Sequence, residues 1–222
     1  MPGIIVFDVN ETLLDLSVTK EPFQRIFGDE DIRREWFAQL IQLSHVVTIT
    51  DTYRDFRTLA GEGLEVVAAR HGVVLDEASR AAIVGLIVQL PPHPDVPGSL
   101  DTLRAAGFSL VALTNSPPAT VEAQLTNAGL IDRFDRVMSV DSTGRFKPHP
   151  APYRMAANEL GVEPEDLWMV AAHDWDIFGA MQVGFRGAFI ARPGQGFSPG
   201  YPPADLVGAD LSEVAELLIA RQ

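Results

Sequence analysis

Short apolar runs that stop abruptly at polar residues punctuate this chain. The first run covers residues 4–7 and ends at Asp8. Residues 108–113 and 167–172 follow the same format, each with polar residues directly after the run. Such runs are typical of central parallel strands, because both faces of those strands are covered by other residues. We also expect short strands at residues 134–140, 187–191 and 205–208.

Helical patterns alternate with these strands in the second half of the chain. We expect helices at residues 97–106, from Pro117 to just before Gly129, at 150–160 and at 211–220. An alternation of strands and helices favours a parallel sheet with crossover helices. The predicted fold class is therefore α/β, with a doubly wound parallel sheet.

Residues 16–92 interrupt this alternation with an almost wholly helical pattern. The helices expected there cover residues 31–43, 53–71 and 76–90. Residues 91–94 contain three prolines, which cannot continue a helix and mark the exit from this segment. We therefore predict an inserted α-helical domain at residues 16–92 and a core made of residues 1–15 and 93–222.

The composition and charge of the chain limit the kinds of molecule that it could bind. The chain has 222 residues, of which 46% are hydrophobic and 21% charged, as in ordinary globular proteins. Its formal net charge of −13 argues against binding to nucleic acid or to an anionic membrane surface. A small anionic substrate needs only a local cationic pocket, so the charge does not exclude one. We find no apolar run of membrane-spanning length and no leader pattern, and we therefore expect a cytoplasmic protein.

The absence of cysteine removes several kinds of chemistry. With no cysteine in the chain, disulfides, thiolate catalysis and zinc–thiolate sites are all excluded.

Four strand or loop ends carry polar groups that could form one site. Asp8 with Thr12 follows the first strand, and residues 114–116 follow the second. Lys147 lies in a later loop, and the last group is made of residues 173–176. An isolated aspartate after a strand usually caps a turn. However, the carboxyl ends of parallel strands meet at one edge of the sheet, where ligands gather, so the repeated format favours a functional site.

This ordered set of motifs resembles the haloacid dehalogenase superfamily. That family has an aspartate on the first strand, a Thr or Ser after the second, a Lys in a later loop and acidic residues after the next strand. It also inserts a cap domain after the first motif, so the resemblance covers the whole chain. The resemblance implies a Rossmann-like core, with residues 16–92 as the cap.

Asn10 favours one branch of that superfamily. Phosphatase members carry a second Asp two residues after the nucleophile as their general acid and base, and they hold a magnesium ion. Asn10 stands at that position here and cannot transfer a proton. Residues 7–15, 114–117, 147–150 and 175–180 are instead similar to the L-specific 2-haloacid dehalogenases. Membership of this branch implies no metal, no cofactor, a small 2-haloacid and water as reactants, and a homodimer as a plausible state.

The resemblance assigns catalytic roles to four residues. Asp8 displaces the halide and forms an ester on its own carboxylate, which water then hydrolyses. Lys147 keeps Asp8 ionised, although a lysine in a loop is often merely solvated. Thr12 orients Asp8 or is an ordinary turn hydroxyl. Asp176 holds Lys147 or places the water.

The substrate side is expected around the second motif. Ser116 precedes a helix whose free N–H groups suit a carboxylate, although the same geometry fits a simple helix cap. Asn115 is expected to donate to the halide or to the carboxylate. The remaining predicted substrate contacts are Asn10, Gln42, Thr114, Tyr153 and Trp175, although an aromatic residue such as Tyr153 is often part of a core.

Glu11 stands where the family usually has glycine before Thr12. Two further departures from the family pattern concern the halide and the water. Residues 39–45 lack the cap arginine that usually helps to bind the halide, so Gln42 or Asn115 is expected to replace it. His173 stands where an asparagine is common, and we expect it to activate the hydrolytic water. Glu21 is the expected carboxylate partner of His173, with Asp174 as the competitor.

Two rival functions stay open at this level. The first is a magnesium-dependent phosphatase or phosphonate hydrolase of the same superfamily, against which Asn10 argues. The second is a catalytically idle binding protein. The missing cap arginine favours this hypothesis, whereas the presence of Asp8, Lys147 and Asp176 together argues against it.

Overall fold

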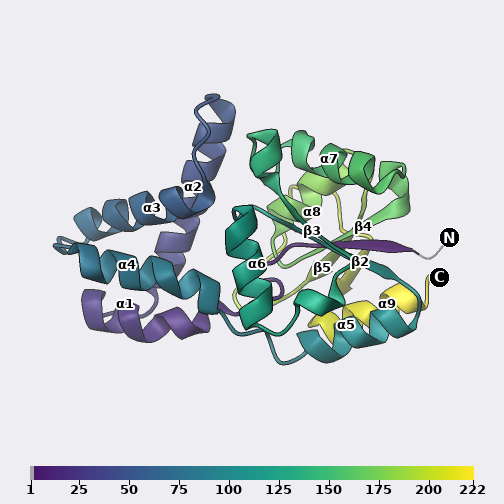
Figure 1. Cartoon of the computed structure of the whole chain (residues 1–222), viewed down its shortest axis with the longest axis horizontal. Coiled ribbons are helices and arrows are strands. Elements are labelled where there is room, and N and C mark those ends of the chain that lie inside the picture. Colours follow the sequence, from purple (N-terminus) through teal and green to yellow (C-terminus); the bar gives the residue numbers. More distant parts are fainter. Residues whose placement is uncertain (1–2) are drawn as a thin grey trace.

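A six-stranded parallel sheet forms the centre of the computed structural model, which describes residues 3–222 (Figure 1). The strand order is β3-β2-β1-β4-β5-β6, and every neighbouring pair is parallel. The strands are β1 (Ile4–Phe7), β2 (Ser109–Thr114), β3 (Arg136–Ser139), β4 (Leu167–Ala171), β5 (Arg186–Ile190) and β6 (Leu206–Gly208). The α/β class predicted from the sequence is confirmed.

The strand order places Asp8 at the centre of the sheet edge. β1 pairs with β2 on one side and with β4 on the other, so the chain order reverses beside it. Phe7, the last residue of β1, is in register with Ala112 and Val170. The backbone N–H of Asp8 donates to the carbonyl of Val170 at 3.1 Å. Asp8 therefore lies at the switch point of the sheet, where ligands of doubly wound folds bind.

Helices cover both faces of the sheet. They are α5 (Val96–Ala105), α6 (Pro118–Asn127), α7 (Pro150–Leu160), α8 (Asp174–Met181) and α9 (Leu211–Ile219). In Figure 1, α7 and α8 lie above the sheet, and α5 and α9 lie below it. Val6 packs in the same cluster as Ile177 of α8, whereas Ile5 packs with Leu100 of α5. Because alternate residues of β1 reach opposite layers, the strand is apolar throughout.

The helices between β1 and α5 form a separate layer at one end of the sheet. They are α1 (Lys20–Phe27), α2 (Ile32–Ile49), α3 (Phe56–Arg70) and α4 (Glu77–Leu86), followed by a short 3-10 helix at Ile87–Gln89. Trp36 of α2 is buried, packs on Phe23 at a ring distance of 5.5 Å and donates its indole N–H to the carbonyl of Ala60 of α3. This is the cap that the resemblance implies (Figure 1).

The boundaries of several elements differ from the predicted ones. The helix expected at residues 31–43 continues to Ile49, because Ser44 and Val47 keep a buried face beyond Leu43. α3 begins only at Phe56, where the Asp55 side chain accepts from the N–H of Thr58. No separate helix was predicted for α1 or for α8, the latter of which starts directly after His173. Among residues 3–222, no helix is both long and apolar enough to cross a lipid bilayer.

Gly179 lets α8 approach the loop that carries Lys147. A Cβ atom at this position would lie 2.5 Å from the Cβ of Pro148, 2.8 Å from its carbonyl oxygen and 2.9 Å from the hydroxyl of Tyr153. These distances are too short for any side chain larger than hydrogen. At Gly179, α8 therefore packs directly against the loop that carries Lys147.

We predict that Gly179→Ala lowers the free energy of unfolding by about 1–3 kcal/mol, because the added methyl group overpacks this contact. Gly85→Ala in α4 is the matched control, since a Cβ there meets nothing within 4 Å. Alanine suits a helix interior better than glycine, so the control should keep or raise stability by up to about 1 kcal/mol. Urea denaturation of both variants measures the difference, and equal stabilities would contradict the tight contact.

Candidate active site

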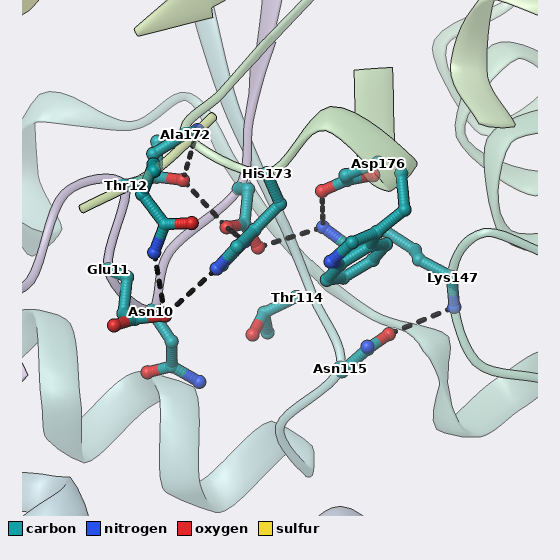
Figure 2. Close-up of polar contacts among 12 residues, drawn as sticks. Asn10, Glu11, Thr12, Thr114, Asn115, Lys147, Ala172, His173 and Asp176 are labelled. Carbon is teal, nitrogen blue, oxygen red and sulfur yellow. Dashed lines mark hydrogen bonds and ion pairs between the residues drawn. The ribbon is translucent and has the colours of Figure 1, made fainter. Parts of the chain in front are cut away.

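Asp8 is a buried carboxylate with partners on both oxygens. Its exposed fraction is 5%, and its Oδ2 accepts the hydroxyl of Thr12 at 2.7 Å. The Thr12 oxygen in turn accepts the backbone N–H of Ala172 at 2.9 Å (Figure 2). The other oxygen of Asp8, Oδ1, accepts Lys147 Nζ at 2.9 Å. The Thr12 hydroxyl thus links the ends of β1 and β4 and orients Asp8 between them.

Lys147 is buried between two carboxylates. Its Nζ donates to Asp8 Oδ1, to Asp176 Oδ2 at 2.6 Å and to the carbonyl of Leu113 at 2.8 Å. These three acceptors take all the protons of the ammonium group. Its backbone N–H donates to Asn115 Oδ1 at 3.0 Å, which ties the loop to the end of β2 (Figure 2).

The charges of this group explain the pKa shifts of Lys147 and Asp8, whereas burial raises the pKa of Asp176. Burial alone would lower the pKa of Lys147, but the charges of Asp176 and Asp8 raise it above its ordinary value. Burial also opposes ionisation of Asp8, yet the charge of Lys147 and the hydrogen bond from His173 hold its pKa well below the usual range. Asp8 is therefore an ionised carboxylate at neutral pH, the state that a nucleophile requires.

Asp176 is positioned by Tyr153. The Tyr153 hydroxyl donates to Asp176 Oδ1 at 2.6 Å and is completely buried. Burial and the neighbouring charge of Asp176 raise the pKa of Tyr153 far above its ordinary value, so the hydroxyl keeps its proton and remains a donor. Tyr153 was expected to contact the substrate, but its hydroxyl faces Asp176 instead.

His173 connects Asp8 to a second carboxylate. Its Nδ1 lies 3.2 Å from Asp8 Oδ2, and its Nε2 lies 3.0 Å from Glu11 Oε2 (Figure 2). Burial would lower the pKa of His173, but the hydrogen bonds with Asp8 and Glu11 raise it to about 10. In this arrangement His173 is an imidazolium at neutral pH.

The carboxylate partner predicted for His173 was wrong. Glu21 lies on α1, where its side chain is 72% exposed and pairs with Arg25. Asp174, the competitor, accepts the backbone N–H groups of Trp175 and Ser198. Chain proximity to Asp8 suggested Glu21, but the cap chain carries it away from the sheet edge.

Glu11 is a functional residue that the sequence reasoning missed. Glu11 has φ 60°, a left-handed conformation that favours glycine. The family usually has glycine just before the residue that matches Thr12, so the glutamate here holds a strained backbone conformation. That side chain reaches His173 and also accepts from Gln195 Nε2 at 3.3 Å.

The residues after β2 form a polar group on the side toward the cap. Asn10 Nδ2 donates to Ser116 Oγ at 3.3 Å, and Gln124 Nε2 donates to Asn10 Oδ1 at 2.8 Å. The Ser116 N–H donates to Thr114 Oγ1, but among residues 3–222 the Ser116 hydroxyl has no acceptor and can donate to an anion. Within residues 3–222, the Nδ2 of Asn115 has no hydrogen-bond acceptor, so it too is available.

Gln42 does not take the place of the missing cap arginine. It is exposed on α2 and lines neither the cleft at His173 nor the small pocket at Asn10. Gln39, one turn earlier, is buried and accepts from Arg70 at 2.6 Å. Of the two predicted halide contacts, Asn115 alone lies near Asp8.

A cleft of about 670 Å³ opens onto His173 and Glu11. Trp175, a predicted substrate contact, lies in its wall and stacks on His173 at 5.0 Å. The sequence reasoning overlooked the cationic side chains of the cleft. These are Lys20, Arg33, Arg34 and Arg192. Of these four, Arg33 has no carboxylate within ion-pair distance among residues 3–222, and its Nε is buried without a partner.

Residues 3–222 contain no group of three or more His, Asp or Glu side chains arranged to hold a metal ion. The carboxylates of the site instead share Lys147 and His173 as their cations. The arrangement can supply an ionised nucleophile, a cation beside it and an imidazole with an orienting carboxylate.

Comparisons with known proteins are consistent with this geometry. A family model described as haloacid dehalogenase-like hydrolase matches residues 3–184. The (S)-2-haloacid dehalogenase of Xanthobacter autotrophicus is 32% identical over 193 residues, which are 86% of this chain and 76% of that protein. The (S)-2-haloacid dehalogenase of Pseudomonas sp. (strain YL) is 28% identical over 215 residues, or 96% of this chain and 93% of that protein. The structure of the L-2-haloacid dehalogenase from Xanthobacter autotrophicus with chloropropionic acid covalently bound matches with a TM-score of 0.91 at 27% identity and covers 98% of both chains.

The charge pairing of His173 predicts a pH-dependent contribution to stability. The pKa of His173 is about 10 in the folded chain, against 6.5 in the unfolded chain. The charge pairing of His173 therefore contributes fully to the free energy of unfolding below pH 6.5, and this contribution is lost as the pH rises through about 10. We predict that His173→Asn is less stable than the wild type by on the order of a few kcal/mol below this window, and that the difference shrinks across it. Asp8 stays ionised throughout. Urea denaturation at several pH values measures the difference, and a constant gap would contradict the imidazolium.

Proposed function

Because the chain belongs to the haloacid dehalogenase-like hydrolase family, in its L-2-haloacid dehalogenase branch, we propose that it hydrolyses short L-2-haloalkanoic acids to D-2-hydroxy acids. The observation that carries this proposal is the state of Asp8, an ionised carboxylate between Lys147 and Thr12 at the centre of the sheet edge. Asn10 in place of a second acid supports dehalogenation over phosphate hydrolysis, because an alkyl halide needs no proton on its leaving group.

The first step is a displacement at the carbon that bears the halogen. An oxygen of Asp8 forms a bond to that carbon, and the carbon–halogen bond breaks with its electron pair leaving on the halide. The hydroxyl of Ser116 suits the substrate carboxylate, and Asn115 Nδ2 is placed to donate to the halide. The start of α6 adds little, because Pro117 and Pro118 have no N–H and the N–H groups of Thr120 and Val121 already donate to the carbonyl of Pro117. Attack opposite the leaving group inverts the carbon, so an L substrate yields a D product.

Formation of the ester changes the charge next to His173. Asp8 loses its negative charge, so the main partner that raises the pKa of His173 disappears. The imidazolium then releases the Nδ1 proton to solvent through the cleft and becomes a neutral base. Glu11 holds Nε2–H and so fixes the tautomer.

The second step is hydrolysis of the ester. Water attacks the carbonyl carbon of Asp8 as His173 Nδ1 accepts a proton, and Lys147 stabilises the developing oxyanion. The bond between the Asp8 carbonyl carbon and the ester oxygen then breaks. The substrate leaves as an alkoxide, which takes the proton from His173 and becomes the hydroxy acid. The remaining proton passes from Asp8 to His173, which restores the ion pair. The substrate carbon is untouched in this step, so its configuration is preserved.

The cationic wall of the cleft supports an anionic substrate. Lys20 and Arg34 are paired with Glu30 and Asp31, whereas Arg33 has no carboxylate within ion-pair distance among residues 3–222 and so offers positive charge at the opening toward His173. The exact bounds of the cap at residues 16–92, a cytoplasmic location and a homodimer stay predictions of the sequence.

We predict that the protein releases halide from L-2-chloropropionate but not from the D form, in the presence of a chelator. Asp8→Asn should lower the rate by roughly 10³-fold or more, because the variant has no nucleophile. Ion chromatography measures the halide. Release of phosphate from a phosphomonoester with magnesium, and no halide from either enantiomer, would contradict the proposal and favour the phosphatase rival.

We predict that His173→Asn and Glu11→Gln both accumulate the Asp8 ester, since displacement does not need a neutral base but hydrolysis does. The turnover rate should fall by about 10²- to 10⁴-fold in His173→Asn and by less in Glu11→Gln. Mass spectrometry of the intact protein after mixing with substrate detects the ester.

Glu21→Gln is the matched control for the glutamate variant. Its side chain lies in solvent, so its turnover and its mass spectrum should match those of the wild type. An ester that accumulates in Glu21→Gln and not in Glu11→Gln would reverse the assignment of the carboxylate partner.

A further inference from the structure

Phe37 is a cap residue that contacts the proposed base. It lies on α2, and its ring centroid is 5.8 Å from that of His173, with an angle of 19° between the planes. Trp175 stacks on the same imidazole at 5.0 Å and 18°. Trp175 belongs to α8, two residues from His173, and so moves with it. Phe37 comes from the other domain, and its contact exists only when the cap is docked on the core.

The same ring separates two cavities. Phe37 and Leu16 line both the open cleft and a small inner pocket of about 10 Å³. The inner pocket also contains Asn10, which donates to Ser116 on the substrate side. The cleft side contains His173 and Glu11. Phe37 thus lies between Asn10, on the Ser116 side of the site, and the open cleft through which substrate and water reach His173.

An aromatic face favours the charged form of an imidazole. The face of a benzene ring carries negative charge density and attracts a cation stacked upon it. In the hydrolysis step, His173 changes from neutral imidazole to imidazolium as it takes the proton of the attacking water. A ring that stabilises the imidazolium therefore makes His173 a stronger base, and its contact also fixes the orientation of the imidazole.

We propose that Phe37 is a positioning residue for ester hydrolysis, which holds and activates His173 when the cap is docked. The inference rests on the proposed function, because it needs the aspartyl ester and His173 as the base. Displacement by Asp8 does not use His173 as a base, so Phe37 affects the two chemical steps unequally. Loss of the ring should slow hydrolysis and leave displacement nearly unchanged.

Other charges around His173 are common to the wild type and the variants. Asp8 and Glu11 contact the ring directly, and Lys147 and Asp176 lie behind Asp8. The charged or titratable groups that face it across the cleft are Asp15, Lys20, Arg33, Arg34, Arg192 and His93. None of them changes when Phe37 is replaced by an uncharged residue, so a shift in the pH profile reports the loss of the ring.

The test compares Phe37→Leu with Phe37→Tyr, which keeps the ring, and with Phe27→Leu as a control. Phe27 lies on α1, stacks on Phe23 at 5.4 Å and lines none of the cavities around the site. Rapid quench with L-2-chloropropionate gives the first-turnover halide burst, mass spectrometry gives the ester, and steady-state assays give kcat against pH. Phe37→Met is a second variant in case Phe37→Leu does not fold, which circular dichroism shows.

For Phe37→Leu we expect an unchanged burst, an accumulated ester and a kcat lower by roughly 3- to 30-fold. The acidic limb of the kcat profile should move to lower pH, because the imidazolium has lost its stacking partner. Phe37→Tyr should restore both, and Phe27→Leu should match the wild type. A slower burst without ester, or an unchanged kcat and pH profile, would overturn the role of Phe37. A wild type that releases no halide would instead contradict the proposed function itself.

Discussion

The Lys147 ammonium between Asp8 and Asp176 is the interaction on which the rest of the site depends. A buried lysine is costly unless every proton has an acceptor, and here two carboxylates and one carbonyl provide them. The same ammonium keeps Asp8 ionised in a site from which water is largely removed. Such an ion pair adds little to stability when compared with apolar packing. Its place at the sheet edge is better explained by the chemistry it permits.

The cap is connected to this interaction through the loop that carries Lys147. Thr48, near the end of α2, accepts the backbone N–H of Phe146 at 3.1 Å. Tyr53 donates to Asp141, and Arg145 pairs with Asp51, so three contacts join the cap to residues 141–146. Movement of the cap therefore changes the surroundings of both cations of the site, His173 through α2 and Lys147 through this loop.

The sequence predicted the parts of the site that depend on strand order. Asp8 and Thr12 follow β1 and Asp176 follows β4, and a parallel sheet brings the ends of such neighbouring strands together. Lys147 lies in the loop after β3, was predicted from the family resemblance, and reaches Asp8 because Asn115 and the close contact at Gly179 hold that loop in place. Glu21 and Gln42 were misplaced because they lie on the cap helices, whose orientation depends on packing between distant residues such as Trp36 and Ala60. Helix periodicity shows which residues share a face, but not which face is turned toward the core.

Glu11 combines a costly backbone conformation with a side chain that the site uses. Its left-handed backbone, φ 60°, costs on the order of 1 kcal/mol for a residue that has a Cβ atom, and glycine would remove that cost. The ion pair with His173 works in the opposite direction, because it stabilises the folded chain while His173 is charged. Glycine at this position would therefore remove the backbone cost together with the carboxylate that offsets it and orients His173.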